Sequence, residues 1–263
     1  MSPKLASKVI VVVGGTTGLG LSAAKAFVQA GAKVVVVGRN PESAALAETA
    51  LGVSAKVLAG DACNPRTAPI AIEAAIRAFG GFHGLYHVAG GSGRKMGDGP
   101  LHEISDAGWD FTLNLNLTSL FYSNRAAVQQ FMKQGTGGSV LNMGSVLGFS
   151  PSPKFFSTHA YATTKAAIIG LTKSAASLYA SSNIRFNVLA PSLVATPMSE
   201  RAQNEQAILD FIATKQPLDG GRIGRASDFD DAAVYFLSED SKFVTGQVLA
   251  VDGGWSVTEG QYG

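Results

Sequence analysis

The sequence has a single cysteine, Cys63, in 263 residues. One cysteine excludes a disulfide within the chain and leaves no cysteine cluster for a metal. Charged residues make up only 15% of the chain and the basic ones are scattered, so the basic stripe that nucleic-acid binding requires is missing. No apolar run approaches the roughly 20 residues that span a bilayer, and the N-terminus does not resemble a secretory signal. We therefore expect a soluble, cytoplasmic protein that binds neither nucleic acid nor a membrane.

The stretch from Val9 to Ala30 carries the clearest binding signal. Five β-branched residues, Val9 to Val13, predict a strand that is buried on both faces, as in a parallel sheet. Gly14, Gly18 and Gly20 follow with the spacing G-x-x-x-G-x-G, and an alanine-rich segment then predicts a helix. Glycines let a ligand approach the backbone, and a helix N-terminus attracts an anion. The stretch therefore indicates a site for the pyrophosphate of a dinucleotide; the alternative is a glycine-rich turn that binds nothing.

Predicted strands and helices alternate along the rest of the chain. Further strands are predicted at 33–37, 55–59, 85–88, 140–143, 184–189 and 247–251, and further helices at 42–51, 65–79, 109–132, 159–180 and 228–237. This alternation predicts βαβ units with right-handed crossovers. We expect an α/β fold with a seven-stranded, mostly parallel, doubly wound sheet that has helices on both faces. Residues 1–263 are expected to form one domain, with a substrate lid near 192–216.

Tyr161 and Lys165 are four residues apart and so share one face of the predicted helix. Reduction of a ketone needs a proton at the oxygen while a hydride reaches the carbon. A tyrosine is a poor acid–base group at neutral pH because its unperturbed pKa is about 10, and a neighbouring positive charge lowers that pKa. We therefore expect Lys165 to lower the pKa of Tyr161 and Tyr161 to transfer the proton; the alternative is a solvated helix face.

With these residues in place, the chain resembles the short-chain dehydrogenase/reductase family, which has a Rossmann-type fold. Asn116, Ser145, Tyr161 and Lys165 match the four residues of the family's catalytic tetrad. The resemblance implies that Tyr161 is the general acid or base and that Ser145 holds the substrate oxygen. It also implies that Lys165 binds the nicotinamide ribose and that Asn116 anchors a water that relays protons.

The same resemblance implies the residues that contact the dinucleotide. Asp61 falls where the family has an acid beside the adenine, and Pro191 with Thr196 resembles the segment beside the nicotinamide. The full set of expected contacts is Gly14, Thr16, Thr17, Gly18, Leu19, Gly20, Arg39, Asp61, Ala62, Ala89, Gly90, Tyr161, Lys165, Pro191, Val194 and Thr196. Three positions depart from the family pattern, namely Val13, His87 and Ser192. The first two touch hydrogen bonds of the sheet and of the loop, and they put local geometry in doubt more than chemistry.

The end of the second predicted strand indicates which dinucleotide is bound. Many dinucleotide folds have an acid there that binds the ribose 2′-hydroxyl. This chain has Gly38 at that place, followed by Arg39, whose guanidinium can form a fork with a 2′-phosphate. We therefore expect NADP(H) rather than NAD(H). The alternative is that Arg39 only stacks on the adenine and that NAD is preferred.

The substrate is expected to be a small to medium, neutral carbonyl or alcohol. Phe149, Phe155, Phe156, Leu193 and Met198 can form an apolar pocket wall, although ordinary core packing is the alternative. Arg94 and Lys95, in a glycine-rich loop, can bind an anionic substrate, but loop charges are usually only solvated. His83 and His87 lack a nearby partner for metal binding, so no metal is expected.

These residues together predict an NADP-dependent oxidoreductase that interconverts a carbonyl and an alcohol. The competing hypothesis is a non-catalytic dinucleotide sensor or scaffold on the same fold. The predicted helix 159–180 is apolar nearly all round, so a second subunit is expected to cover its outer face. We expect a homo-oligomer, a dimer or a tetramer; the alternative is that loops of the same chain cover this helix.

Overall fold

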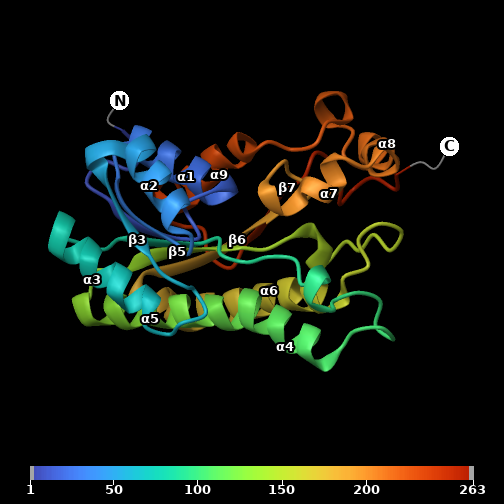
Figure 1. Ribbon diagram of the computed structural model, residues 1–263. Helices are drawn as coiled ribbons and strands as arrows, with labels where there is room; N and C mark the ends of the chain where they lie inside the picture. The colour runs from blue at the N-terminus through green and yellow to red at the C-terminus, as the bar shows by residue number, and fades with distance from the viewer. Residues whose placement is uncertain (1–2, 261–263) are drawn as a thin grey trace.

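The computed structural model of the chain, which describes residues 3–260, is built around a parallel sheet (Figure 1). Within those residues every neighbouring pair of strands is parallel, in the order β3-β2-β1-β4-β5-β6-β7. The strands are β1 (Val9–Val13), β2 (Lys33–Gly38), β3 (Ala55–Ala59), β4 (Gly84–His87), β5 (Gly138–Met143), β6 (Ile184–Pro191) and β7 (Val248–Val251). The predicted α/β class and doubly wound sheet are confirmed.

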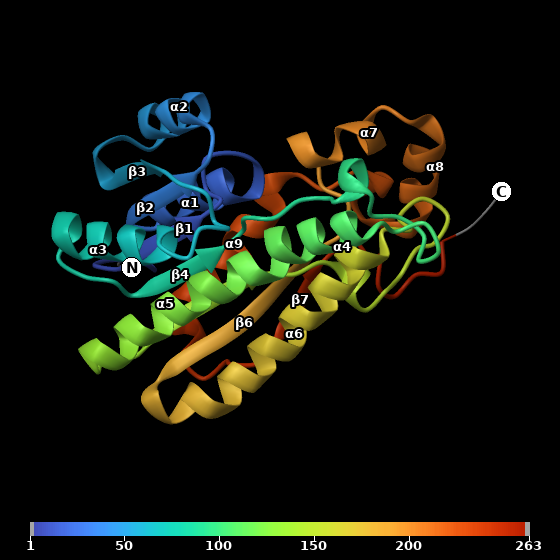
Figure 2. The same ribbon diagram turned by 60° about the horizontal axis from the view of Figure 1, so that its bottom comes forward.

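Helices cover both faces of the sheet (Figures 1 and 2). One face carries α1 (Gly18–Gln29), α2 (Pro41–Leu51) and α9 (Asp230–Leu237). The other carries α3 (Thr67–Phe79), α4 (Asp106–Leu113), α5 (Ser119–Gln134) and α6 (His159–Tyr179). Two shorter helices, α7 (Glu200–Gln203) and α8 (Gln206–Lys215), follow β6 and lie beyond one end of the sheet. They form the helical part of the segment that was predicted as a lid.

The opening strand is buried on both faces, as its apolar sequence predicts. Ile10 and Val12 pack with Phe27 of α1 in one core cluster, whereas Val9, Val11 and Val13 pack with α3 and α5 in the other. None of the five residues is more than 3% exposed. Because all the strands are parallel, their carboxyl ends meet at one edge, which is where open α/β sheets bind ligands.

The helix predicted over 109–132 is longer and is interrupted. Helical structure runs from Asp106 to Gln134, with Ser105 capping its start and Gly135 ending it at a φ of 68°. Between α4 and α5 the backbone forms a π-helical turn at Asn114–Thr118. Such turns are often found at functional sites. Asn116 lies in the middle of this one.

The two histidines near β4 bond to groups of the fold. His87 is buried, and its ring nitrogens lie 3.0 Å from the Ser123 hydroxyl and 3.1 Å from the Ala89 carbonyl oxygen. Burial lowers the pKa of His87 to about 3, so the ring is neutral. Nδ1 of His83 accepts a hydrogen bond from the backbone of Val9.

Among residues 3–260 no helix combines the length and apolarity needed to cross a bilayer.

Candidate active site

The glycine turn after β1 is packed so tightly that two of its positions admit no side chain. Gly14 has a φ of +87°, and a Cβ there would lie 2.5 Å from the backbone nitrogen of Ala89. A Cβ on Gly20 would lie 2.1 Å from the carbonyl oxygen of Gly14. The first turn of α1 holds no acidic residue, and its N-cap makes no side-chain hydrogen bond. The turn therefore leaves backbone N–H groups that suit a pyrophosphate.

A cavity of about 720 Å³ opens over this turn and extends past the ends of β4, β5 and β6. It is lined by nearly all the residues that were expected to contact the dinucleotide: Gly14, Thr16, Thr17, Gly18, Leu19, Arg39, Asp61, Ala62, Ala89, Gly90, Tyr161, Lys165, Pro191, Val194 and Thr196. Gly20 is not among the lining residues, because it faces the inside of the turn. A cleft of this size with glycine walls fits an extended dinucleotide.

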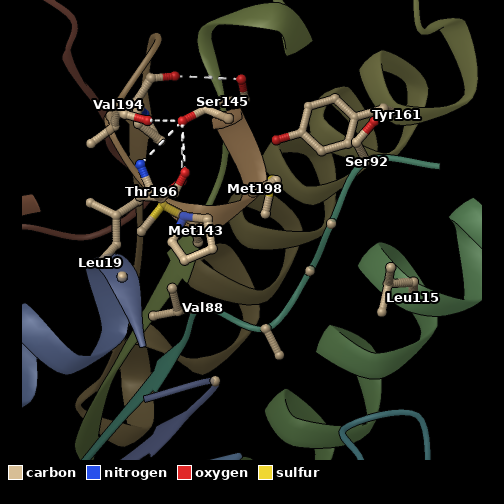
Figure 3. A pocket seen from close by; sticks show the side chains of 18 of the residues that line it. Leu19, Val88, Ser92, Leu115, Met143, Ser145, Tyr161, Val194, Thr196 and Met198 are labelled. Atoms are coloured by element: carbon tan, nitrogen blue, oxygen red, sulfur yellow. Dashed lines mark hydrogen bonds between the residues drawn. The ribbon is translucent and has the colours of Figure 1, made fainter. Parts of the chain in front are cut away.

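Tyr161 and Ser145 face each other across this cavity. Figure 3 shows the Tyr161 hydroxyl pointing toward Ser145. The Ser145 hydroxyl lies 3.4 Å from the carbonyl oxygen of Pro191 and accepts a hydrogen bond from the backbone N–H of Leu147 at 3.2 Å. Both residues line the cavity, so a substrate oxygen placed between the two hydroxyls meets two possible donors.

The electrostatics of Tyr161 and Lys165 differ from the expectation. Burial raises the pKa of Tyr161 to about 12, although interaction with Ser145 lowers it in part. The Lys165 ammonium lies 5.3 Å from the centre of the Tyr161 ring and donates to the carbonyl oxygen of Met143 at 2.9 Å. Burial lowers the pKa of Lys165 to about 8. The pKa of Tyr161 therefore lies above its ordinary value, not below it as expected, because desolvation is the largest influence on it; the expected contribution of the Lys165 charge stays a prediction.

Asn116 lies behind the cavity and does not line it. Its carboxamide accepts from the backbone N–H of Gly91 and donates to the carbonyl oxygens of Gly91 and Thr112, each at 3.0 Å. These bonds use both of its donors and tie the loop after β4 to α4. The expected role of Asn116 in anchoring a water stays a prediction. In this structure its hydrogen bonds hold the loop after β4 against α4.

Asp98 is a site residue that sequence reasoning missed. Its buried carboxylate accepts from the backbone N–H groups of Ala160 and Tyr161, both at 2.9 Å. The adjacent Gly99 carbonyl accepts from His159. The first three N–H groups of α6 are thus satisfied from a loop some 60 residues earlier, which fixes the backbone of Tyr161.

The apolar wall is only partly as expected. Phe156, Leu193 and Met198 line the cavity, as does Trp255, which sequence reasoning missed. Phe149 and Phe155 are not among the lining residues, and the Phe155 ring instead packs on Phe211 of α8. Arg94, Lys95 and Arg201 also line the cavity.

Sequence comparison identifies known proteins that are similar to this chain. The family profile described as enoyl-(acyl carrier protein) reductase matches residues 13–256. The 2,5-dichloro-2,5-cyclohexadiene-1,4-diol dehydrogenase LinX of Sphingobium indicum is 33% identical over 260 residues, which cover 98% of this chain and 99% of that protein. A dehydrogenase is therefore similar to this chain over nearly its whole length.

Solved structures agree with the sequence comparison. A short-chain type dehydrogenase/reductase from Mycobacterium ulcerans superposes with a TM-score of 0.88 at 31% identity, covering 97% of this chain and 92% of that one. A 3-ketoacyl-(acyl-carrier-protein) reductase from Brucella melitensis complexed with NADH has a TM-score of 0.84 at 26% identity, covering 96% of this chain and 100% of that one. The seven-stranded sheet and its helices are shared with both structures, one of which was solved with NADH bound.

Proposed function

Because the chain belongs to the short-chain dehydrogenase/reductase family, we propose that it is an NADP-dependent alcohol dehydrogenase or carbonyl reductase with Tyr161 as its general acid and base. Membership makes it an oxidoreductase that acts on CH–OH groups with a nicotinamide dinucleotide. The observation that carries the proposal is the pair of hydroxyls, from Tyr161 and Ser145, that face one cavity continuous with the glycine turn. The NADP preference and the residue roles are the proposed part.

A nicotinamide dinucleotide bound over the glycine turn, against Gly14, Gly18 and Lys165, would supply the hydride chemistry, adding a hydride to a carbonyl carbon or removing one from an alcohol. Ser145 donates a hydrogen bond to the substrate oxygen and orients it toward Tyr161. Tyr161 gives its proton to that oxygen during reduction and takes a proton back during oxidation. The Lys165 ammonium stabilises the phenolate that remains after proton transfer, since it lies over the same ring.

The elevated pKa of Tyr161 bears on the initial rates of the two reaction directions at neutral pH. A phenol with a pKa near 12 is fully protonated there and is ready to act as the acid in reduction. Oxidation needs the phenolate, which is rare at neutral pH and becomes commoner as pH rises. We therefore propose that the initial rate of reduction exceeds that of oxidation near neutrality.

The preference for NADP(H) is supported by the end of β2. A Cβ on Gly38 would lie 2.1 Å from the Thr16 hydroxyl oxygen, so an acidic side chain does not fit at that position while Thr16 stays in place. Arg39 follows, is exposed, and lines the same cavity. A guanidinium there favours a 2′-phosphate over a free 2′-hydroxyl.

Replacing Arg39 by alanine tests this preference. We expect the Kd for NADPH to rise at least tenfold, as for loss of a charge-assisted contact worth about 1.5–3 kcal/mol. The Kd for NADH should change by less than about threefold, a few tenths of a kcal/mol. Isothermal titration with both cofactors measures this, and Arg66→Ala, an exposed arginine outside the cavity, is the matched control. Equal losses for the two cofactors would assign Arg39 to the adenine ring.

We also propose a homo-oligomer, in which other subunits cover the outer faces of α4, α5 and α6. Apart from Lys165, the buried residues of α6 repeat at the spacing of a single face, on Ala160, Thr164, Ile168, Thr172 and Ala176. Loops of the same chain therefore do not bury the rest of this helix within residues 3–260. Exposed apolar side chains on the same side include Phe111, Phe121 and Leu178.

Residues 192–216 are proposed as a substrate lid of a single domain over 1–263.

A further inference from the structure

Two arginines from distant segments converge on one backbone oxygen beside the cavity. Arg94 lies in the loop between β4 and α4, and Arg201 lies in α7. Nη2 of each donates to the carbonyl oxygen of Phe155, at 3.4 Å from Arg94 and 3.3 Å from Arg201. Because both Nη2 atoms lie within hydrogen-bond distance of the same carbonyl oxygen, the two guanidinium groups are close neighbours. Arg94 and Arg201 are called the arginine pair below.

Hydrogen bonds link the loop that carries Arg94 to the start of α6, where Tyr161 lies. The Asp98 carboxylate accepts from the backbone N–H of Tyr161, and the Asp98 N–H donates to the carbonyl oxygen of Gly93. Two hydrogen bonds therefore connect the residue before Arg94 to the backbone of the proposed proton donor. Both arginines and Tyr161 line the same cavity.

The lining of the cavity is strongly positive. Among residues 3–260 its one acidic residue is Asp61, which follows β3, the edge strand four positions from β5 in the sheet. The arginine pair therefore has no acid from the lining beside it. Five lining residues are basic, compared with the one acid Asp61: Arg39, Arg94, Lys95, Lys165 and Arg201.

Other charges next to the arginine pair compensate it only in part. Burial and the charge of Arg201 lower the pKa of Arg94, while Asp98 acts in the opposite sense. Arg201 also pairs through Nη1 with Glu205 at 2.9 Å, but both side chains are nearly half exposed and such a pair contributes little. Two like charges held together in this way favour a bound anion between them.

We propose that the arginine pair binds an oxyanion group of the substrate, such as a carboxylate or sulfonate, while Ser145 and Tyr161 bind its carbonyl or hydroxyl oxygen. The inference rests on the proposed function, because it extends the same cavity from reaction type to substrate class. A guanidinium fork matches two oxygens of a carboxylate or sulfonate, and the hydrogen bonds to the Phe155 carbonyl hold both side chains in place before the substrate arrives. The substrate is then an oxo acid or hydroxy acid, not the neutral compound expected from the sequence.

Paired substrates test the proposal. The full-length protein with saturating NADPH is titrated and assayed with pyruvate, acetoacetate, 4-oxopentanoate and 2-oxopropanesulfonate, and with the methyl esters of the three carboxylates. We expect the preferred acid to exceed its ester at least tenfold in affinity and in kcat/KM. The double variant Arg94→Gln/Arg201→Gln should lower that acid-to-ester ratio at least tenfold. Arg66→Gln should keep the ratio, and Glu205→Gln should raise acid affinity by removing a competing carboxylate.

The outcomes separate this inference from the proposed function. Acids that bind through the arginine pair but are never reduced would leave the anion site standing and overturn the reductase. Neutral ketones or esters that are reduced as well as the acids would overturn the anion site and leave the reductase standing. An acid preference that survives in the double variant would also overturn the anion site, because the preference would then arise elsewhere.

Discussion

Replacing Tyr161 by phenylalanine should lower kcat for carbonyl reduction by about a thousandfold, within the range that a general acid contributes. The hydroxyl is the only group removed, and it faces the cavity toward Ser145. The ring stays beside the Lys165 ammonium, 5.3 Å from the ring centre, so the walls of the cofactor site should be preserved. The Kd for NADPH should therefore stay within about threefold of the wild-type value, a change of a few tenths of a kcal/mol.

Steady-state assays with NADPH and a panel of ketones, together with isothermal titration of NADPH, measure the two effects separately. Tyr179→Phe is a matched control, because Tyr179 lies at the other end of α6 and does not line the cavity. Retention of more than a tenth of the activity in Tyr161→Phe would remove this residue from the chemistry. A non-catalytic sensor predicts a different pattern, with NADPH binding and no reduction of any ketone by the wild type.

Replacing Asp98 by alanine should have the second largest effect, on stability and on catalysis together. The change leaves the N–H groups of Ala160 and Tyr161 buried without their 2.9 Å acceptors. Hydrogen bonds to a charged group are worth about 1.5–3 kcal/mol each, so we expect the loss of two to lower the free energy of unfolding by roughly 3–6 kcal/mol. Because the same bond fixes the backbone of Tyr161, kcat should fall more than the affinity for NADPH.

Chemical denaturation and steady-state kinetics on the same variants check this expectation. Asp98→Asn keeps an acceptor oxygen and should recover part of both losses. Asp106→Ala removes an exposed acid from the first turn of α4 and should cost only about 0.3–1 kcal/mol, as is usual for an exposed charge at a helix end. If Asp98→Ala resembled Asp106→Ala in stability and left kcat unchanged, Asp98 would have no positioning role.

The parts of the site that could be predicted depend on local sequence. The strand Val9–Val13 has an unbroken apolar run, and Gly14 and Gly20 have the spacing of a turn that admits no side chains. Tyr161 and Lys165 are four residues apart, so helical periodicity alone puts them on one face. Signals of this kind are contained within a few residues, and the fold confirms the elements that they predict.

The parts that could not be predicted depend on contacts between distant segments. Asp98 meets α6 across 62 and 63 residues of chain, and Arg201 meets the Phe155 carbonyl across 46. The raised pKa of Tyr161 reflects burial by many neighbours, whereas sequence reasoning had only the charge of Lys165 to consider. A capping contact between distant segments leaves no pattern of residue spacing in the sequence, and neither does a desolvation energy.

We propose that Tyr161 gives its proton to the substrate beside the Lys165 ammonium, and the pH dependence of the two reaction directions tests this role most directly. The rate of reduction should be constant from about pH 6 to about pH 7. It should fall as pH rises through about 8, because Lys165, whose pKa is lowered by burial, loses its charge there while Tyr161 keeps its proton. Oxidation should accelerate up to about pH 8, because more of Tyr161 is ionised while Lys165 keeps its charge. A reduction rate that rises with pH, or an oxidation rate that does not, would contradict the account.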